Sequence, residues 1–180
     1  MSRRILVAFA SKHGSTVEVA EVIAASLTER GLQVEVRRAD DVEETAGYDG
    51  VVLGGALYMG RLHRDARRFL HRHRETLALL PFAVFAMGPK TLEANDVAIS
   101  RAQLEHALDT VPEAEPFTVA IFGGVVDPHE LDVPFNRMPA SDGRDWDAIH
   151  AWADEIASRF GGTERVAAAA LDPVGAASAH

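Results

Sequence analysis

Five short apolar runs alternate with longer segments of helical period, and this alternation limits the chain to few folds. The runs are short and rich in Val, Ile and Phe, as strands buried on both faces are. We expect strands at 5–9, 34–36, 51–53, 82–86 and 117–122, and helices at about 16–30, 63–76, 95–108 and 145–160. Strands that alternate with helices predict an α/β fold whose parallel sheet is covered by helices on both faces.

Length and composition fit one domain followed by a tail. The chain has 180 residues, the usual size of a single domain, and we expect the domain to span residues 1–160. Residues 161–180 include an alanine run and predict a loosely attached, Ala-rich C-terminal tail. The apolar run at 5–10 is too short for an export signal or a membrane span, so the sequence favours a cytoplasmic protein.

Composition also excludes several kinds of chemistry. The chain has no cysteine, so any electron transfer must use a bound cofactor rather than thiols. A net charge of −9 argues against nucleic-acid binding, which favours basic surfaces. His71 and His73 are two residues apart and do not share a helical face, so they predict no metal site.

The segment from Phe9 to Thr16 leads from the first expected strand directly into a helix. Such a turn presents free backbone N–H groups, hydroxyls and the positive end of the helix dipole, which suit a phosphate monoester. The alternative is that Ser15 or Thr16 only caps the helix. The turn lacks the three spaced glycines of a dinucleotide fingerprint and the Gly-Lys pair of a Walker A loop. We therefore expect a mononucleotide.

A second segment of interest, from Gly54 to Gly60, follows the third expected strand. Its glycines permit the close approach of a flat ligand. Tyr58 offers an aromatic face for stacking, and Met59 offers a polarizable contact. The alternative is a plain turn with a partly buried tyrosine.

The motif Phe9-x-Ser11-x-x-Gly14-x-Thr16-x-x-x-Ala20-x-x-Ile23 resembles the FMN-phosphate signature of the flavodoxin family. The resemblance implies a flavodoxin-like three-layer sandwich with a five-stranded parallel sheet in the order 2-1-3-4-5. It also implies that FMN is the cofactor and that its phosphate is held by Ser11, Lys12, His13, Gly14, Ser15 and Thr16. Two loops would then flank the flavin ring: Ala56, Leu57, Tyr58, Met59 and Gly60 in one, and Met87, Gly88 and Pro89 in the other, with Gly124 nearby.

Three further stretches are similar to the menaquinone-dependent protoporphyrinogen oxidase family, an offshoot of the flavodoxins: Leu53-Gly54-x-x-x-Tyr58-x-Gly60-x-x-His63, Gly123-Gly124 to Pro128, and Asp145-Trp146. The similarity implies an FMN-dependent oxidoreductase that oxidises protoporphyrinogen IX and passes the electrons to a quinone. The alternatives are a soluble flavodoxin-type electron carrier without a small-molecule substrate, and an interaction module that has lost its cofactor. The segment from Val125 to Gly143 is shorter than the corresponding segment of that family, and its first residues are more acidic. No side chain stands out as a catalytic base.

Residues 61–74 form a strongly basic segment directly after the second loop. This segment has six arginines and one aspartate, so its formal charge is +5. Because the whole chain has a net charge of −9, the remaining residues together carry −14. Arg61, Arg64 and Arg68 are candidates to receive tetrapyrrole propionates, anionic lipid heads or an acidic partner. The alternative is a solvated helix face whose buried side is marked by Phe69 and Leu70. The expected partners are a porphyrinogen, a quinone or a flavin reductase, with peripheral contact at the inner face of the membrane.

Overall fold

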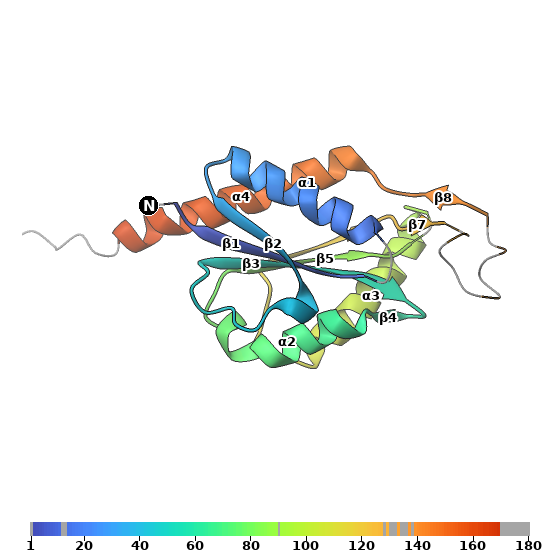
Figure 1. Ribbon diagram of the computed structural model, residues 1–180, viewed down its shortest axis with the longest axis horizontal. Helices are drawn as coiled ribbons and strands as arrows, with labels where there is room; N and C mark the ends of the chain where they lie inside the picture. Colours follow the sequence, from blue (N-terminus) through green and yellow to red (C-terminus); the bar gives the residue numbers. More distant parts are fainter. Residues whose placement is uncertain are drawn as a thin grey trace, which may run out of the picture.

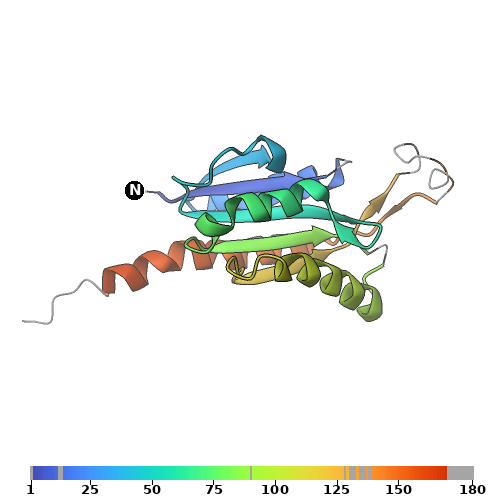
Figure 2. The ribbon, with the colours of Figure 1, turned by 90° about the horizontal axis from the view of Figure 1, so that it is seen from below.

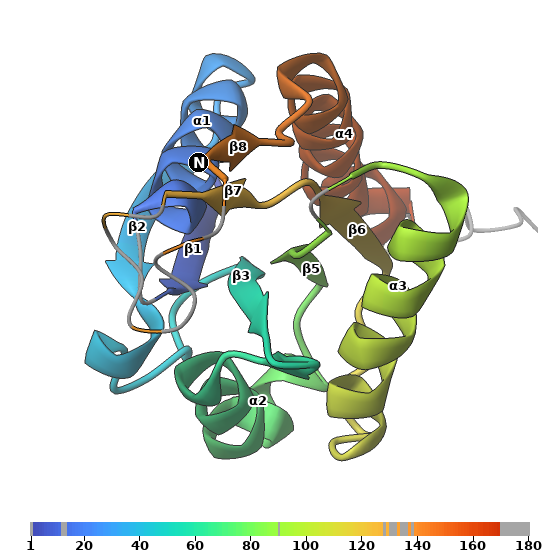
Figure 3. The same ribbon diagram turned by 90° about the vertical axis from the view of Figure 1, so that its right-hand side faces the viewer.

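The computed structural model describes residues 2–11, 14–89, 91–127, 129, 133, 137 and 139–169, with side chains as far as residue 162. Its central sheet has five parallel strands in the order β2-β1-β3-β5-β6 (Figure 3). Their bounds are β1 Arg4–Ala10, β2 Gln33–Arg38, β3 Gly50–Tyr58, β5 Phe82–Met87 and β6 Thr118–Phe122. The strands occur where the apolar runs predict them, and the order confirms the sheet implied by the resemblance to flavodoxins.

Helices cover both faces of the sheet and create two separate cores. Helices α1 (Ser15–Glu29) and α4 (Trp146–Ala169) lie on one face, and α2 (Arg64–Leu77) and α3 (Ala94–Asp109) lie on the other (Figures 1 and 3). Successive residues of β1 serve opposite cores: Ile5 and Val7 pack under α1 and α4, and Leu6 and Ala8 pack towards α2. Because adjacent strand residues point to opposite faces, a strand covered on both sides must be apolar throughout. A short 3₁₀ turn, η1 (Ala39–Asp41), follows β2.

Helix α4 ends later than the sequence predicts. The expected end near Phe160 is wrong, because the helix continues to Ala169 and extends beyond the sheet (Figure 2). Gly161 and Gly162 therefore lie inside the helix instead of ending it. Residues 170–180 of the expected tail lie outside the described part of the chain, so the boundary between domain and tail stays a prediction. Among the described residues, no helix is both long enough and apolar enough to cross a membrane.

The segment after the third strand is a β-hairpin and not the loop that its glycines suggest. Strand β3 runs as far as Tyr58, and β4 (Arg61–Leu62) pairs with it antiparallel. Met59 and Gly60 connect the strands with φ values of 51° and 77°, the left-handed pair that a two-residue type I′ turn requires. Gly54 lies within β3, where a Cβ atom would stand 2.1 Å from the Phe85 ring. This glycine thus makes room for the packed Phe85 ring, whereas the sequence suggested that it admits a flat ligand.

Two more short strands, β7 (Val125–Val126) and β8 (Ser141–Asp142), pair with each other beyond the carboxyl end of β6. They project from the same edge of the molecule as the β3–β4 hairpin (Figures 1 and 2). The connections that end at this edge include nearly all the residues that the sequence singles out. In open parallel sheets, ligands bind at this edge.

Candidate functional site

The turn between β1 and α1 leaves the start of the helix without a side-chain cap. The N-cap residue is Gly14, so neither Ser15 nor Thr16 caps the helix, and that alternative is wrong. The first backbone amides of an α-helix have no acceptor within the helix and point out from its end. A Cβ atom built on Gly14 would meet nothing within 4 Å, so the N-cap position itself is not packed against other residues. Lys12 and His13, which are also expected here, lie outside the described residues.

Thr16 adds a second feature at the same turn. The residue is fully buried, and its hydroxyl has no hydrogen-bond partner among the described residues. A buried hydroxyl without a partner costs about 1–3 kcal/mol, and native proteins pair most such groups. Ser11, at the end of β1, is half-buried on the other side of the turn. An unpartnered hydroxyl and free helix amides together suit an anion at this position.

Arg144 links the β7–β8 hairpin to this turn. Its guanidinium pairs with Glu18 in the first turn of α1 and with Asp142, at 2.7 Å from Nη2 to Oδ2, and lies over the Trp146 ring. The Arg144 side chain is 11% exposed, and its hydrogen bonds hold the pKa of Asp142 below the usual value. The pair with Arg144 offsets the charge of Glu18, which would otherwise repel an anion at the helix start.

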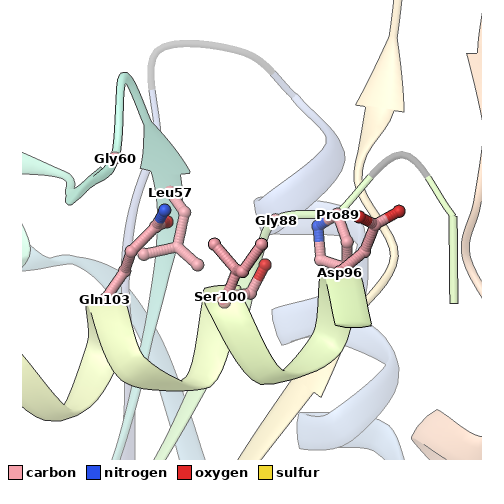
Figure 4. Close-up of a pocket in the computed structure, with 8 residues that line it drawn as sticks. Leu57, Gly60, Gly88, Pro89, Asp96, Ser100 and Gln103 are labelled. Carbon is pink, nitrogen blue, oxygen red and sulfur yellow. The ribbon is translucent and has the colours of Figure 1, made fainter. Parts of the chain in front are cut away.

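A hollow of about 320 Å³ lies between the β3–β4 hairpin and α3 (Figure 4). We call it the ring hollow, and its lining residues are Leu57, Gly60, Gly88, Pro89, Asp96, Ile99, Ser100 and Gln103. Four of these come from the two loops that the sequence predicts around a flat ligand. The other four, from α3, were missed. Their spacing of 96, 99, 100 and 103 places them on one helical face, but the sequence does not mark this face, since the exposure of Ile99 is known only from the structure.

The loops after β5 and β6 are held together by their main chains. The Gly88 amide donates to the Phe122 carbonyl at 3.1 Å, and the Gly124 amide donates to the Pro89 carbonyl at 2.9 Å. A Cβ atom on Gly124 would lie 3.0 Å from the Gly88 oxygen, so Gly124 packs behind the loop that carries Gly88. A Cβ atom on Gly88 would lie 2.8 Å from Leu57, which explains the glycine on this wall of the ring hollow.

Three other predicted ring contacts are placed differently. Met87 is 2% exposed and packs in the core under α1 and α4, so it does not line the ring hollow. Ala56 is half-buried, and its carbonyl accepts a hydrogen bond from the His63 amide at 2.8 Å. Met59 stands at the hairpin tip with 71% of its surface exposed.

Tyr58 lines a second hollow, of about 630 Å³, which we call the arginine hollow. Its other lining residues are Ser11, Arg38, Arg61, Leu62, His63, Arg64, Asp65 and Arg67. Leu57 faces the ring hollow and Tyr58 faces the arginine hollow, as successive residues of a strand must. The two hollows therefore lie on opposite faces of one hairpin.

The arginine hollow contains two of the three predicted arginines, Arg61 and Arg64, but not Arg68. Sequence reasoning missed Arg67, which lies one helical turn after Arg64, and Arg38, which strand pairing places beside Phe9. The Arg67 Nε atom donates to the Leu62 carbonyl at 3.0 Å, which fixes its guanidinium at the hollow.

Some of the charge in the arginine hollow is already paired. Arg38 binds Asp40 at 3.0 Å, and Arg64 contacts Asp65 at 3.4 Å. His63 is the N-cap of α2: its Nδ1 accepts from the Asp65 amide at 3.1 Å, and burial lowers its pKa. His63 is thus neutral at pH 7, and the positive charge of the hollow comes from its arginines.

Comparisons with known proteins agree with this architecture. A family model described as a flavodoxin domain matches residues 6–137. The protoporphyrinogen IX dehydrogenase (quinone) of Escherichia coli strain K12 is 30% identical over 87 residues, which are 47% of this chain and 48% of that protein. The match thus spans about half the length of this curated relative.

Solved structures resemble the whole sandwich. A mutant flavodoxin from Pseudomonas aeruginosa has a TM-score of 0.59 at 17% identity, with 88% of this chain and 99% of that chain covered. Flavodoxin 2 from Bacillus cereus has a TM-score of 0.56 at 23% identity, with 89% and 99% covered. Likenesses at this level of identity establish the fold.

Proposed function

This chain belongs to the flavodoxin domain family, and from that premise we propose that it is an FMN-dependent oxidoreductase that oxidises a porphyrinogen and delivers the electrons to a quinone. The family and the fold identify FMN as the cofactor. The substrate and the acceptor are those named for the Escherichia coli relative, of which 48% is matched. As part of the same proposal, the protein acts in the cytoplasm, with peripheral contact at the membrane where quinones dissolve.

The residues at the carboxyl edge fit FMN. The unpartnered Thr16 hydroxyl, Ser11 and the free amides of the first turn of α1 would hold its phosphate. The walls of the ring hollow would hold the flavin ring, since Leu57 and Pro89 supply apolar surface and Gly88 leaves room. When bound there, FMN supplies the electron-accepting chemistry, which the side chains of this chain lack.

One observation carries the choice of an acidic tetrapyrrole as substrate: four arginines line the hollow beside the hairpin that borders the ring hollow. Guanidinium groups bind carboxylates through paired, charge-assisted hydrogen bonds. Arg61 and Arg67 have no carboxylate partner among the described residues, so they are free to bind one from a ligand. Tyr58 adds an aromatic face in the same hollow. These residues bind and orient a flat, acidic ligand across the hairpin from the cofactor.

A soluble electron carrier is the second candidate, and a different observation favours it. The net charge is −9, and Tyr58 and Met59 at the hairpin tip are exposed by 50% and 71%. An acidic surface with an exposed edge suits transient docking to a redox protein.

The experiment is anaerobic reduction of the FMN-loaded protein by protoporphyrinogen IX, followed at the flavin absorbance bands. We expect bleaching that depends on the porphyrinogen, then reoxidation by a menaquinone analogue. Arg61→Gln should raise KM with little change in kcat, because it removes a binding contact and no reacting group. The matched control is Arg101→Gln on α3, outside both hollows. No reduction by porphyrinogen, together with fast electron exchange with a flavin reductase, would establish the carrier instead.

A further inference from the structure

Helix α2 carries guanidinium groups that no carboxylate neutralises. Among the described residues, Arg68 and Arg72 have no ion-pair partner, as is also true of Arg61 and Arg67. Some exposed arginines elsewhere are paired: Arg4 contacts Glu35 at 3.4 Å, and Arg30 contacts Asp154 at 3.1 Å. Because the chain as a whole is acidic, this concentration of free positive charge is a local feature.

The spacing of the arginines along α2 destabilises this helix. Residues 64, 68 and 72 are four apart, so each guanidinium stands one turn from the next, and like charges at this spacing destabilise a helix. The packing of α2 does not need them, because its buried face consists of Ala66, Phe69, Leu70, His73 and Leu77. In this row, Arg64 contacts Asp65, whereas Arg68 and Arg72 have no ion-pair partner among the described residues, so these two like charges are better explained by a ligand than by the fold.

The row borders a third hollow, of about 730 Å³, which we call the distal hollow. Its lining residues are Arg64, Arg67, Arg68, His71, Arg72, Arg74 and Thr110. Arg64 and Arg67 also line the arginine hollow, so the two hollows adjoin along α2.

Paired groups stand at the far end of the distal hollow. The His71 Nε2 atom is 3.1 Å from the Thr110 hydroxyl at the end of α3, and Arg74 contacts Glu113 at 3.3 Å. Among the described residues, Arg67, Arg68 and Arg72 are the arginines of this hollow without an ion-pair partner.

We propose that the arginine hollow and the distal hollow form one groove that binds two carboxylates of a single ligand. The first carboxylate is held at Arg61 and Arg67, and the second at Arg68 and Arg72. On α2, Arg67 of the first site and Arg72 of the second are separated by about 7.5 Å along the helix axis, from the rise of roughly 1.5 Å per residue. A macrocycle with two flexible propionate arms fits such a pair of sites. The identity of this ligand rests on the proposed function, whereas the two-point groove rests on the arginines themselves.

The test measures binding without turnover. Mesoporphyrin IX, its monomethyl ester and its dimethyl ester carry two, one and no free carboxylates, and none of them is a porphyrinogen that can be oxidised. We expect the FMN-loaded protein to bind the diacid roughly tenfold more tightly than the monoester, and the monoester roughly tenfold more tightly than the dimethyl ester, in a fluorescence titration. All differences should shrink at high salt.

Two variants separate the two sites. The double variant Arg68→Gln/Arg72→Gln should abolish the advantage of the diacid over the monoester and leave monoester binding intact. Arg61→Gln should weaken both ligands. The matched control, Arg101→Gln, should bind all three porphyrins as the wild type does. Circular dichroism of each variant checks that the helix is retained.

Three results would overturn the groove. One is equal binding of the diacid and the dimethyl ester. Another is a double variant that binds the diacid as tightly as the wild type does. The third is a double variant that loses only its attachment to phosphatidylglycerol vesicles, which would assign the row to lipid headgroups. If the diacid binds as expected but protoporphyrinogen IX does not reduce the flavin, the proposed function fails and the groove stands.

Discussion

Replacing Thr16 with valine should stabilise the apoprotein and weaken its binding of FMN. Thr16 is fully buried, and its hydroxyl has no partner among the described residues. Valine keeps the branched shape and replaces only the hydroxyl with a methyl group, so packing is conserved. A substitution that raises the free energy of unfolding and lowers the affinity for FMN indicates a polar group whose hydrogen-bond partner is the ligand.

Both magnitudes follow from the hydrogen bond that is missing in one state and formed in the other. Removing an unsatisfied buried hydroxyl should raise the free energy of unfolding of the apoprotein by about 1–3 kcal/mol. A hydrogen bond to a charged phosphate contributes about 1.5–3 kcal/mol, so its loss should weaken FMN binding by roughly ten- to a hundredfold. Because ligand binding adds to stability by linkage, the FMN-saturated variant should unfold close to the wild type.

Urea unfolding of the apoprotein measures the first effect, and quenching of flavin fluorescence measures the second. Thr45 provides a matched control, because it is 1% exposed and its hydroxyl also lacks a partner among the described residues. It precedes β3 at the amino end of the sheet, opposite the predicted phosphate turn. Thr45→Val should therefore give a similar gain in stability and no change in FMN affinity.

Two results would refute this reasoning. If Thr16→Val binds FMN as tightly as the wild type, the phosphate does not use this hydroxyl and its assignment to the first turn of α1 is wrong. If Thr16→Val weakens FMN binding but Thr45→Val weakens it equally, the effect is a general change in the fold and not a lost contact.

Three further results are expected. Gly123→Ala should lower the free energy of unfolding, measured in urea, by about 1–3 kcal/mol or more, because its Cβ would stand 1.9 Å from the Gly143 carbonyl oxygen. Gly14→Ala is the control: its Cβ would meet nothing within 4 Å, so the free energy of unfolding should change by less than about 0.5 kcal/mol. His73 is buried, and burial lowers its pKa. The free energy of unfolding should therefore be highest above about pH 6.5 and should decrease below that pH, because the unfolded chain then takes up a proton that the folded chain does not. His73→Phe should flatten this part of the pH profile, and parallel profiles of the variant and the wild type would contradict the assignment. Arg68→Gln removes two like-charge contacts in α2 of about 0.2–0.5 kcal/mol each, so the variant should be up to about 1 kcal/mol more stable at low salt, with the difference lost in high salt.

The sequence predicted the framework because each strand has its own local signal. The run from Ile5 to Phe9 is apolar throughout, and in the structure it lies between β2 and β3 under helices on both sides. The glycines were harder to interpret, because their reasons are not local. The sequence suggested that Gly54 admits a flat ligand, but the atom that requires this glycine belongs to Phe85 on the neighbouring strand.

The candidate site was predicted in part. The phosphate turn is contiguous in sequence, so Ser11, Gly14 and Thr16 could be recognised together. The ring hollow joins a hairpin to one face of α3, and the sequence supplied Leu57, Gly60, Gly88 and Pro89 but not Ser100 or its neighbours. Arg38 reaches the arginine hollow only because β2 pairs with β1, a relation that its own segment does not encode.

By itself the sequence determined the α/β fold and the two-sided burial of the sheet, and it predicted the phosphate turn, since these follow from periodicity and from residues adjacent in the chain. Only the tertiary structure decided that the glycine-rich segment is a hairpin, that Leu57 and Tyr58 face different hollows, and that the Thr16 hydroxyl is left unpartnered. The physical reason is that burial, pairing and free charge are properties of what surrounds a group, and those surroundings come from distant parts of the chain.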